Sequence, residues 1–163
     1  VLPGRLAEGV AREAALATLV GNLRRTAEAF APLGIKVLAE AINPLDMPGF
    51  LINTPQHLLE LIAAVDHANF AAQLDFYHMA RQDLQLPACI AALAGRIGHV
   101  QFADCPGRGA PGSGALAFAE ALAALRASGY DGWLGAEYKP GEAGTAASLG
   151  WLAGWQEAVA DRQ

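Results

Sequence analysis

The sequence has little cysteine, few basic side chains and no long apolar run. Its two cysteines, Cys89 and Cys105, are too few for a disulfide framework and lack the CxxC spacing of metal or redox motifs. We therefore expect both to be reduced, small apolar residues. The chain has 11 basic and 16 acidic residues, so its net charge of −5 would repel a nucleic-acid backbone. The sequence also contains no basic stripe that could bind a membrane surface.

No apolar stretch approaches the roughly 18 residues that a membrane-spanning helix needs. The first residues, VLPGRLAEGVAREAA, lack the basic start and apolar middle of a signal peptide. We therefore expect a cytoplasmic location, no nucleic-acid partner and no membrane contact.

What the sequence does have is a hydrophobic content of 53% in 163 residues without low-complexity tracts. This composition is typical of a single globular domain, here residues 1–163.

Apolar periodicity switches repeatedly between the spacing of helices and that of strands. The predicted strands are residues 35–40, 70–75, 97–104 and 132–138, and the predicted helices are residues 6–30, 83–95, 118–128, 143–160 and one that starts at Pro55 with Thr54 as N-cap. Such alternation predicts an α/β fold with parallel strands, right-handed crossovers and helices outside. An open sheet and a closed barrel both satisfy this pattern.

Each predicted strand ends, or nearly ends, on a side chain that offers an oxygen atom: Glu40, Asp75, Gln101 and Glu137. A strand-terminal acid taken singly is more often a helix cap or a solvated loop residue. Four such residues, on the inward face given by strand alternation, indicate a common site. In parallel α/β folds, ligand sites lie at the carboxyl ends of the strands.

Three carboxylates in one pocket repel one another unless a cation compensates their charge. Carboxylate and amide oxygens suit a hard divalent ion, so we expect Mg²⁺ or Mn²⁺. Zinc is disfavoured because the set lacks thiolates. A divalent ion polarises a substrate carbonyl, and carboxylates on opposite sides can then move a proton.

Four segments resemble the xylose isomerase-like TIM-barrel superfamily, and within it the hydroxypyruvate isomerases. They are EAINPLDMPGF (40–50), LDFYHMAR (74–81), RIGHVQFADCPGRGAPGSGAL (96–116) and GYDGWLGAEYKP (129–140). The resemblance implies a (β/α)8 barrel, of which this chain holds the last four strands and their helices. It also implies that the metal ligands are Glu40, Asp75, Gln101 and Glu137.

The resemblance further implies reversible conversion of hydroxypyruvate to tartronate semialdehyde (2-hydroxy-3-oxopropanoate) through an enediolate. Glu40 and Glu137 are then the catalytic acid and base, and His78 and Arg108 bind the small 2-oxo or hydroxy acid. Gln101 looks more like the hydroxypyruvate isomerases, since related ketose 3-epimerases usually place histidine there.

Two alternatives stay open. One is a ketose 3-epimerase that uses the same metal site. The other is a non-catalytic half-barrel that forms a homo-oligomer, because four parallel strands leave two unpaired edges.

Outside the main set, Asp104 is a candidate for orienting Gln101 or Arg108. Trp133, like the other tryptophans, is expected to pack in the core or on a helix face.

Overall fold

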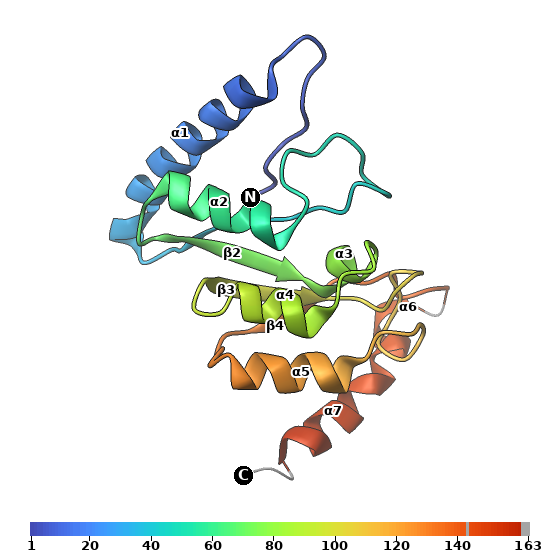
Figure 1. Ribbon diagram of the computed structural model, residues 1–163. Helices are drawn as coiled ribbons and strands as arrows, with labels where there is room; N and C mark the ends of the chain where they lie inside the picture. The colour runs from blue at the N-terminus through green and yellow to red at the C-terminus, as the bar shows by residue number, and fades with distance from the viewer. Residues whose placement is uncertain (143, 161–163) are drawn as a thin grey trace.

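The computed structural model describes residues 1–142 and 144–160 (Figure 1). Its centre is a parallel sheet with the strand order β1-β2-β3-β4. The strands are β1 (Val37–Glu40), β2 (Phe70–Asp75), β3 (Ile97–Phe102) and β4 (Leu134–Ala136). The helices are α1 (Arg12–Phe30), η1 (Ala31–Leu33), α2 (Pro55–Val65), α3 (Phe76–Ala80), α4 (Leu86–Ala92), α5 (Phe118–Ala127), α6 (Gly144–Ala147), η2 (Ser148–Gly150) and α7 (Trp151–Ala160).

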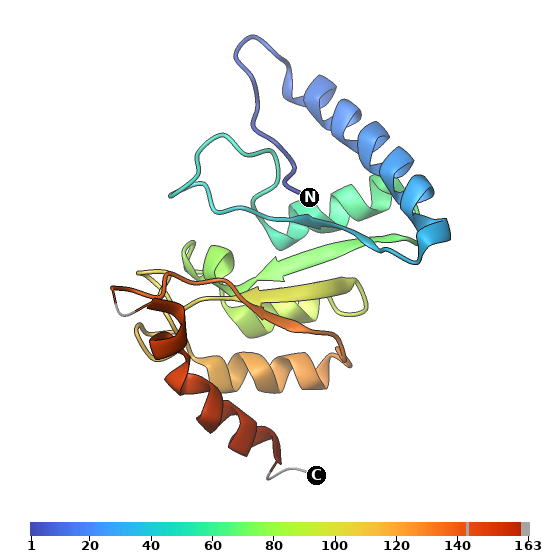
Figure 2. The same cartoon turned by 180° about the vertical axis from the view of Figure 1, so that it is seen from behind.

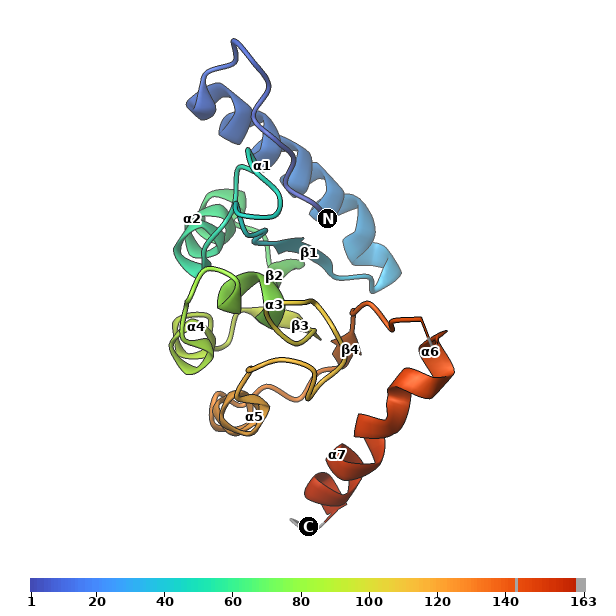
Figure 3. The same cartoon turned by 90° about the vertical axis from the view of Figure 1, so that its right-hand side faces the viewer.

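Helices α2, α4 and α5 lie side by side on one side of the sheet, as Figures 2 and 3 show from two further directions. The predicted alternation of side chains is confirmed on this face. Strand residues that face the helices are buried in the apolar core, and they are Val37, Ala39, Phe70, Ala72, Leu74, Val100 and Phe102. The opposite face therefore carries the polar strand residues, which leaves the four strand ends free to form a site.

A register shift interrupts the pairing of β2 with β3. Ala72 pairs with Ile97, but the next residue, Gln73, pairs with His99. Gly98 is therefore the extra residue of a β-bulge in β3. After the bulge, side chains of β3 resume strict alternation, with Val100 facing the helices.

The bulge places Gln101 opposite Asp75. Without it, continuous pairing would set the preceding valine opposite Asp75 and turn the glutamine to the helix side. Glycine suits the bulge because a Cβ atom on Gly98 would lie 2.5 Å from Leu38 Cδ2 and 3.1 Å from Ala71 Cβ. The position of Gln101 at the site thus depends on a residue without a side chain.

The first helix is shorter than the sequence predicts, since it begins at Arg12 and not at residue 6. The preceding segment is not helical, and it includes an antiparallel bridge from Arg5 to Phe50. The Val1 amino group also donates a hydrogen bond to the Leu38 carbonyl oxygen at 2.8 Å. These contacts hold the N-terminal segment against β1 and the loop after it.

Other predicted boundaries differ by less. Helix α2 starts as expected, with the Thr54 hydroxyl accepting from the His57 backbone N–H at 3.2 Å and Pro55 in the first turn. Strand β4 is shorter than residues 132–138, and helix α4 is shorter than residues 83–95. The helix predicted over 143–160 is divided into α6, η2 and α7, and residue 143 lies outside the described residues.

The prediction for Trp133 is wrong, because its side chain is 85% exposed just before β4. Trp151 and Trp155 do pack, with ring centres 5.5 and 4.8 Å from that of Phe102. The difference arises because β4 is the last strand of the described sheet, so nothing beyond it in this part of the chain covers Trp133. None of the described helices is long and apolar enough to cross a membrane.

Candidate functional site

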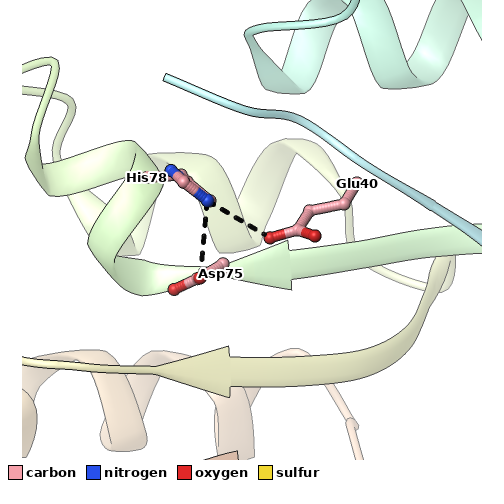
Figure 4. A group of neighbouring side chains, drawn as sticks. All are labelled: Glu40, Asp75 and His78. Atoms are coloured by element: carbon pink, nitrogen blue, oxygen red, sulfur yellow. Dashed lines mark ion pairs between the residues drawn. The ribbon is translucent and has the colours of Figure 1, made fainter. Parts of the chain in front are cut away.

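Two carboxylates and an imidazole meet at the carboxyl ends of β1 and β2. Glu40 is the last residue of β1, Asp75 is the last residue of β2, and His78 lies on α3. All three are buried, and one ligand atom from each lies within 4.8 Å of the others. Figure 4 shows the His78 ring pointing toward both acids, with Nε2 3.6 Å from Glu40 Oε1 and 3.8 Å from Asp75 Oδ2.

Helix α3, which the sequence reading missed, brings His78 to this place. Its N-cap is Asp75, whose Oδ1 accepts a hydrogen bond from the Tyr77 backbone N–H at 2.9 Å. One helical turn then carries the chain back over the strand end, so that His78 stands beside the acid three residues before it. The signal for this short helix was the capping aspartate directly after an apolar strand.

The second oxygen of each acid has no hydrogen-bond partner. Glu40 Oε1 and Asp75 Oδ2 are both buried and lack a hydrogen-bond partner in the described part of the chain, although Arg108 forms a long ion pair with Asp75 Oδ2. Burial and the nearby Asp75 charge raise the pKa of Glu40 to about 7. Burial raises the pKa of Asp75 to about 6, although the Tyr77 N–H and Arg108 oppose the shift. Two buried acids with unpaired oxygens are the environment that a divalent cation would stabilise.

His78 is a neutral imidazole at neutral pH. Its pKa is lowered to about 4, first by burial and then by the positive charge of Arg108. The contacts of His78 with Glu40 and Asp75 are therefore not full ion pairs. A neutral imidazole can serve either as a hydrogen-bond donor or as a lone-pair ligand, depending on its tautomer.

Gln101 joins the site through a residue to which the sequence analysis assigned no role. Gln73 lies two residues before Asp75 on the same face of β2, and its side-chain nitrogen donates to Glu40 Oε2 at 3.1 Å. The same nitrogen donates to Gln101 Oε1. Alternation alone put Gln73 on the site face, but its role as a bridge depends on the relative placement of three strands.

Glu137 and Arg108 are the two remaining residues of the predicted site, and Arg108 contacts both Glu137 and Asp75. Arg108 Nη2 lies 2.8 Å from Glu137 Oε2 and 3.6 Å from Asp75 Oδ2, and its guanidinium carbon lies 5.0 Å from the centre of the Tyr77 ring. The Glu137 side chain is 52% exposed, far more than that of Glu40. Its backbone N–H donates to the Phe102 carbonyl oxygen at 3.0 Å, which holds it just beyond β4.

In the described residues, Asp104 forms no hydrogen bond or ion pair with Gln101 or Arg108, in contrast to the prediction from the sequence. Its carboxylate instead accepts four backbone N–H groups at 2.8 to 3.0 Å, from Cys105, Gly112, Gly114 and Leu116. The acid therefore organises the glycine-rich loop from inside. Arg108 belongs to this loop, so Asp104 affects the site through the loop backbone.

All six residues predicted for the site are connected, but of the four predicted metal ligands only Glu40 and Asp75 belong to the described group whose ligand atoms lie within 4.8 Å of one another, and its third member is His78. Direct contacts or a single intervening side chain link Glu40, Asp75, His78, Gln101, Arg108 and Glu137. Their oxygen-rich composition and shared location are suited to a divalent cation and a small acidic ligand.

Comparison with curated proteins finds relatives along almost the whole chain. It is 39% identical over 151 residues to hydroxypyruvate isomerase of Escherichia coli, covering 93% of this chain and 58% of that protein. It is 37% identical over 157 residues to 2-oxo-tetronate isomerase of Pectobacterium atrosepticum, covering 96% of this chain and 60% of that protein. The chain therefore spans about three fifths of the length of these relatives.

Solved structures give a consistent picture. A crystal structure described as AP endonuclease, family 2, from Brucella melitensis matches with a TM-score of 0.85 and 37% identity, covering 91% of this chain and 57% of that one. D-psicose 3-epimerase from Clostridium cellulolyticum matches with a TM-score of 0.77 and 26% identity, covering 90% and 50%. The four parallel strands are consistent with part of a (β/α) barrel. Residues 1–155 match the model of one protein family, and the chain belongs to that family, the xylose isomerase-like TIM barrels.

Proposed function

We propose that the protein interconverts hydroxypyruvate and tartronate semialdehyde with the help of a divalent metal ion. The observation that carries this proposal is the pair of buried oxygens of Glu40 and Asp75 that lack a hydrogen-bond partner at adjacent strand ends. Relatives named hydroxypyruvate isomerase support the choice of substrate. Because the chain spans only part of these relatives, the proposal concerns the whole protein to which it belongs.

The proposed ligands of the ion are Glu40, Asp75, Gln101 and Glu137, and the proposed ion is Mg²⁺ or Mn²⁺. All four side chains offer oxygen, which these ions prefer. When bound, such an ion polarises the substrate carbonyl and stabilises negative charge on it. The unpaired oxygens and raised pKa values of Glu40 and Asp75 support a cation at this place.

The two glutamates are suited to moving the proton. Glu40 has a pKa of about 7, near the value at which a carboxyl group can both accept and donate a proton at neutral pH. We assign Glu40 and Glu137 to the two transfers at carbon, in which one removes a C3 proton to give the enediolate and the other returns a proton at C2. The proton of the C3 hydroxyl group moves to the C2 oxygen, which leaves an aldehyde at C3 and a hydroxyl group at C2. We assign binding of the substrate carboxylate to Arg108, and its position beside both Asp75 and Glu137 supports this assignment.

Two other substrates are chemically close. A 2-oxo-tetronate isomerase would use the same proton transfer on a substrate longer by one carbon, and several relatives carry that name. A ketose 3-epimerase would move a proton at C3 of a longer sugar, and the match to D-psicose 3-epimerase favours considering it. The remaining alternative is not an enzyme but a non-catalytic half-barrel that forms a homo-oligomer.

Proton NMR in D₂O tests these possibilities with the full-length protein. Hydroxypyruvate, 2-oxo-tetronate and D-psicose are each incubated with the protein and Mg²⁺, and again with EDTA. Tartronate semialdehyde, or deuterium at C3 of hydroxypyruvate, appearing only with metal supports the proposal. Faster reaction of 2-oxo-tetronate or of D-psicose would instead favour a 2-oxo-tetronate isomerase or a ketose 3-epimerase. The absence of exchange in any substrate, from a folded protein, removes the catalytic proposal in favour of the self-associating alternative, which sedimentation then tests.

A further inference from the structure

A buried asparagine just beyond β1 has its side-chain amide fixed in orientation. Asn43 is fully buried, and its Oδ1 accepts a hydrogen bond from the Asp46 backbone N–H at 2.8 Å. Its Nδ2 donates to the Asp46 carboxylate at 3.2 Å. A backbone N–H can only donate and a carboxylate here accepts, so these two contacts decide which end of the amide is oxygen.

Asp46, which fixes the orientation of the Asn43 amide, is itself held in place by two side chains. The Tyr77 hydroxyl donates to Asp46 Oδ2 at 2.5 Å, and Arg81 Nε lies 3.0 Å from Asp46 Oδ1. The Tyr77 hydrogen bond is the main cause that lowers the pKa of Asp46. Asp46 therefore stays an ionised acceptor, and the amide of Asn43 keeps its orientation.

Two N–H groups of the same asparagine then meet one nitrogen of His78. Asn43 Nδ2 lies 2.7 Å from His78 Nδ1, and the Asn43 backbone N–H donates to that same atom at 3.4 Å. Nδ1 must accept both, so it carries a lone pair and no proton. In a neutral imidazole the proton is then on Nε2.

We infer that Asn43 is a positioning residue that holds His78 in the Nε2–H tautomer, so that His78 presents a hydrogen-bond donor to the space between Glu40 and Asp75. A histidine that ligates a metal usually donates its other ring N–H to a neighbouring acceptor. His78 shows the reverse pattern, because its outer nitrogen accepts. Its Nε2 is therefore not a metal ligand, although its distance from the two acids would allow one.

The donor has no acceptor within hydrogen-bond distance on either acid. Nε2 lies 3.6 and 3.8 Å from the unpaired oxygens of Glu40 and Asp75, which is too long for direct hydrogen bonds. An oxygen atom of a small oxo or hydroxy acid is the kind of group that this N–H would bind. The binding of a substrate oxygen by this N–H group rests on the proposed function. The tautomer of His78 does not, because it is a property of the protein without substrate.

Histidine NMR tests the tautomer directly. The full-length protein, labelled with ¹⁵N at histidine and free of metal, is studied by long-range ¹H–¹⁵N correlation near neutral pH. We expect His78, assigned from the signal lost in His78→Gln, to show a protonated Nε2 and an unprotonated Nδ1. His57 and His67 are internal references, because their Nδ1 atoms accept the backbone N–H groups of Asn53 and Asn69 at 3.3 and 3.0 Å.

The variant Asn43→Asp tests the role of the asparagine. A carboxylate accepts where the amide donates, so we expect the His78 proton to move to Nδ1. Asn22→Asp, on the exposed surface of α1, adds the same charge and should leave the His78 spectrum unchanged. If Asn43→Asp does not fold, Asn43→Ala is used instead, and both tautomers should then be populated.

Three results would overturn the inference: a protonated Nδ1 in the natural protein, an unchanged spectrum in the folded Asn43 variant, or loss of the Nε2 proton when Mg²⁺ is added. None of these readings requires turnover. Failure of the substrate assignment and failure of the tautomer assignment are therefore separate outcomes.

Discussion

Gln73 and Glu40 stand opposite each other in the register of β2 and β1, and the Gln73 side-chain nitrogen donates to Glu40 Oε2 at 3.1 Å. This bond holds one oxygen of the acid and turns the other, Oε1, toward His78 without a partner. The carboxylate is thus oriented by a neutral neighbour that does not compensate its charge. Burial and then the nearby Asp75 charge raise its pKa to about 7, and the oxygen without a hydrogen-bond partner stays available to a cation.

The pKa of Glu40 predicts how stability depends on pH without metal. The folded-state pKa of about 7 exceeds the ordinary 4.5, so the folded protein binds this proton more tightly and loses stability as pH rises from 4.5 through 7. Glu40→Gln removes the effect. We expect the variant to be more stable than the natural protein by about 3 kcal/mol at pH 8 in EDTA, with the difference shrinking toward pH 5.

Urea denaturation at both pH values measures this difference. Glu120→Gln, on an exposed position of α5, is the matched control and should show the same offset from the natural protein at pH 5 and pH 8. A Glu40→Gln offset that does not change with pH would contradict a raised pKa.

Binding of Mn²⁺ should strengthen as pH rises. Glu40 and Asp75, with pKa values of about 7 and 6, must lose their protons to ligate the ion. We expect the affinity to rise by roughly tenfold per pH unit while Glu40 titrates, and Asp75→Asn to weaken binding at every pH. Calorimetric titration at pH 6, 7 and 8 measures both effects. Equal affinity at pH 6 and 8 would show that these acids do not hold the ion.

Removing either proposed acid or base should slow turnover strongly. General acid–base catalysis contributes about 10²- to 10⁴-fold, so Glu40→Gln and Glu137→Gln should each lower kcat by that order. The pH–rate profiles of the two variants then assign which limb belongs to which residue. Glu120→Gln again serves as the control with unchanged kcat. Near-normal turnover in either site variant would remove that residue from its proposed role.

Adding a methyl group at the β-bulge should destabilise the sheet. In Gly98→Ala the new Cβ would lie 2.5 Å from Leu38 Cδ2 and 3.1 Å from Ala71 Cβ, so one of these groups has to move. We expect a loss of about 1 to 3 kcal/mol in the free energy of unfolding. Gly150→Ala, where nothing lies within 4 Å, should cost much less in the same denaturation experiment. Equal effects would argue that the bulge tolerates a side chain.

Asp104→Asn should loosen the glycine-rich loop. Its carboxylate accepts four backbone N–H groups, and an amide nitrogen cannot replace either accepting oxygen. We expect about 1 to 3 kcal/mol of destabilisation and faster hydrogen exchange at Gly112 and Gly114. Asp131→Asn, at an exposed position, is the control. Unchanged exchange at those two glycines would show that Asp104 does not organise the loop.

The local pattern of the sequence was enough to predict the strands and the residues at their ends. An acid that follows an apolar run is visible in any single segment, and Glu40 and Asp75 do end their strands. The extent of the domain over residues 1–163 stays a prediction. The exposure of Trp133 and the loop role of Asp104 could not be predicted, because each depends on which segments lie nearby in space.

By itself, the sequence determined the α/β class, the alternation of faces and the oxygen-rich strand ends, because these follow from the period of side chains along one strand. Tertiary structure decided the rest of the site. The bulge at Gly98 sets Gln101 opposite Asp75, Gln73 bridges two strands, and the loop after β1 brings Asn43 to His78. Each of these depends on the register between segments far apart in the chain, and periodicity within a segment carries no information about register.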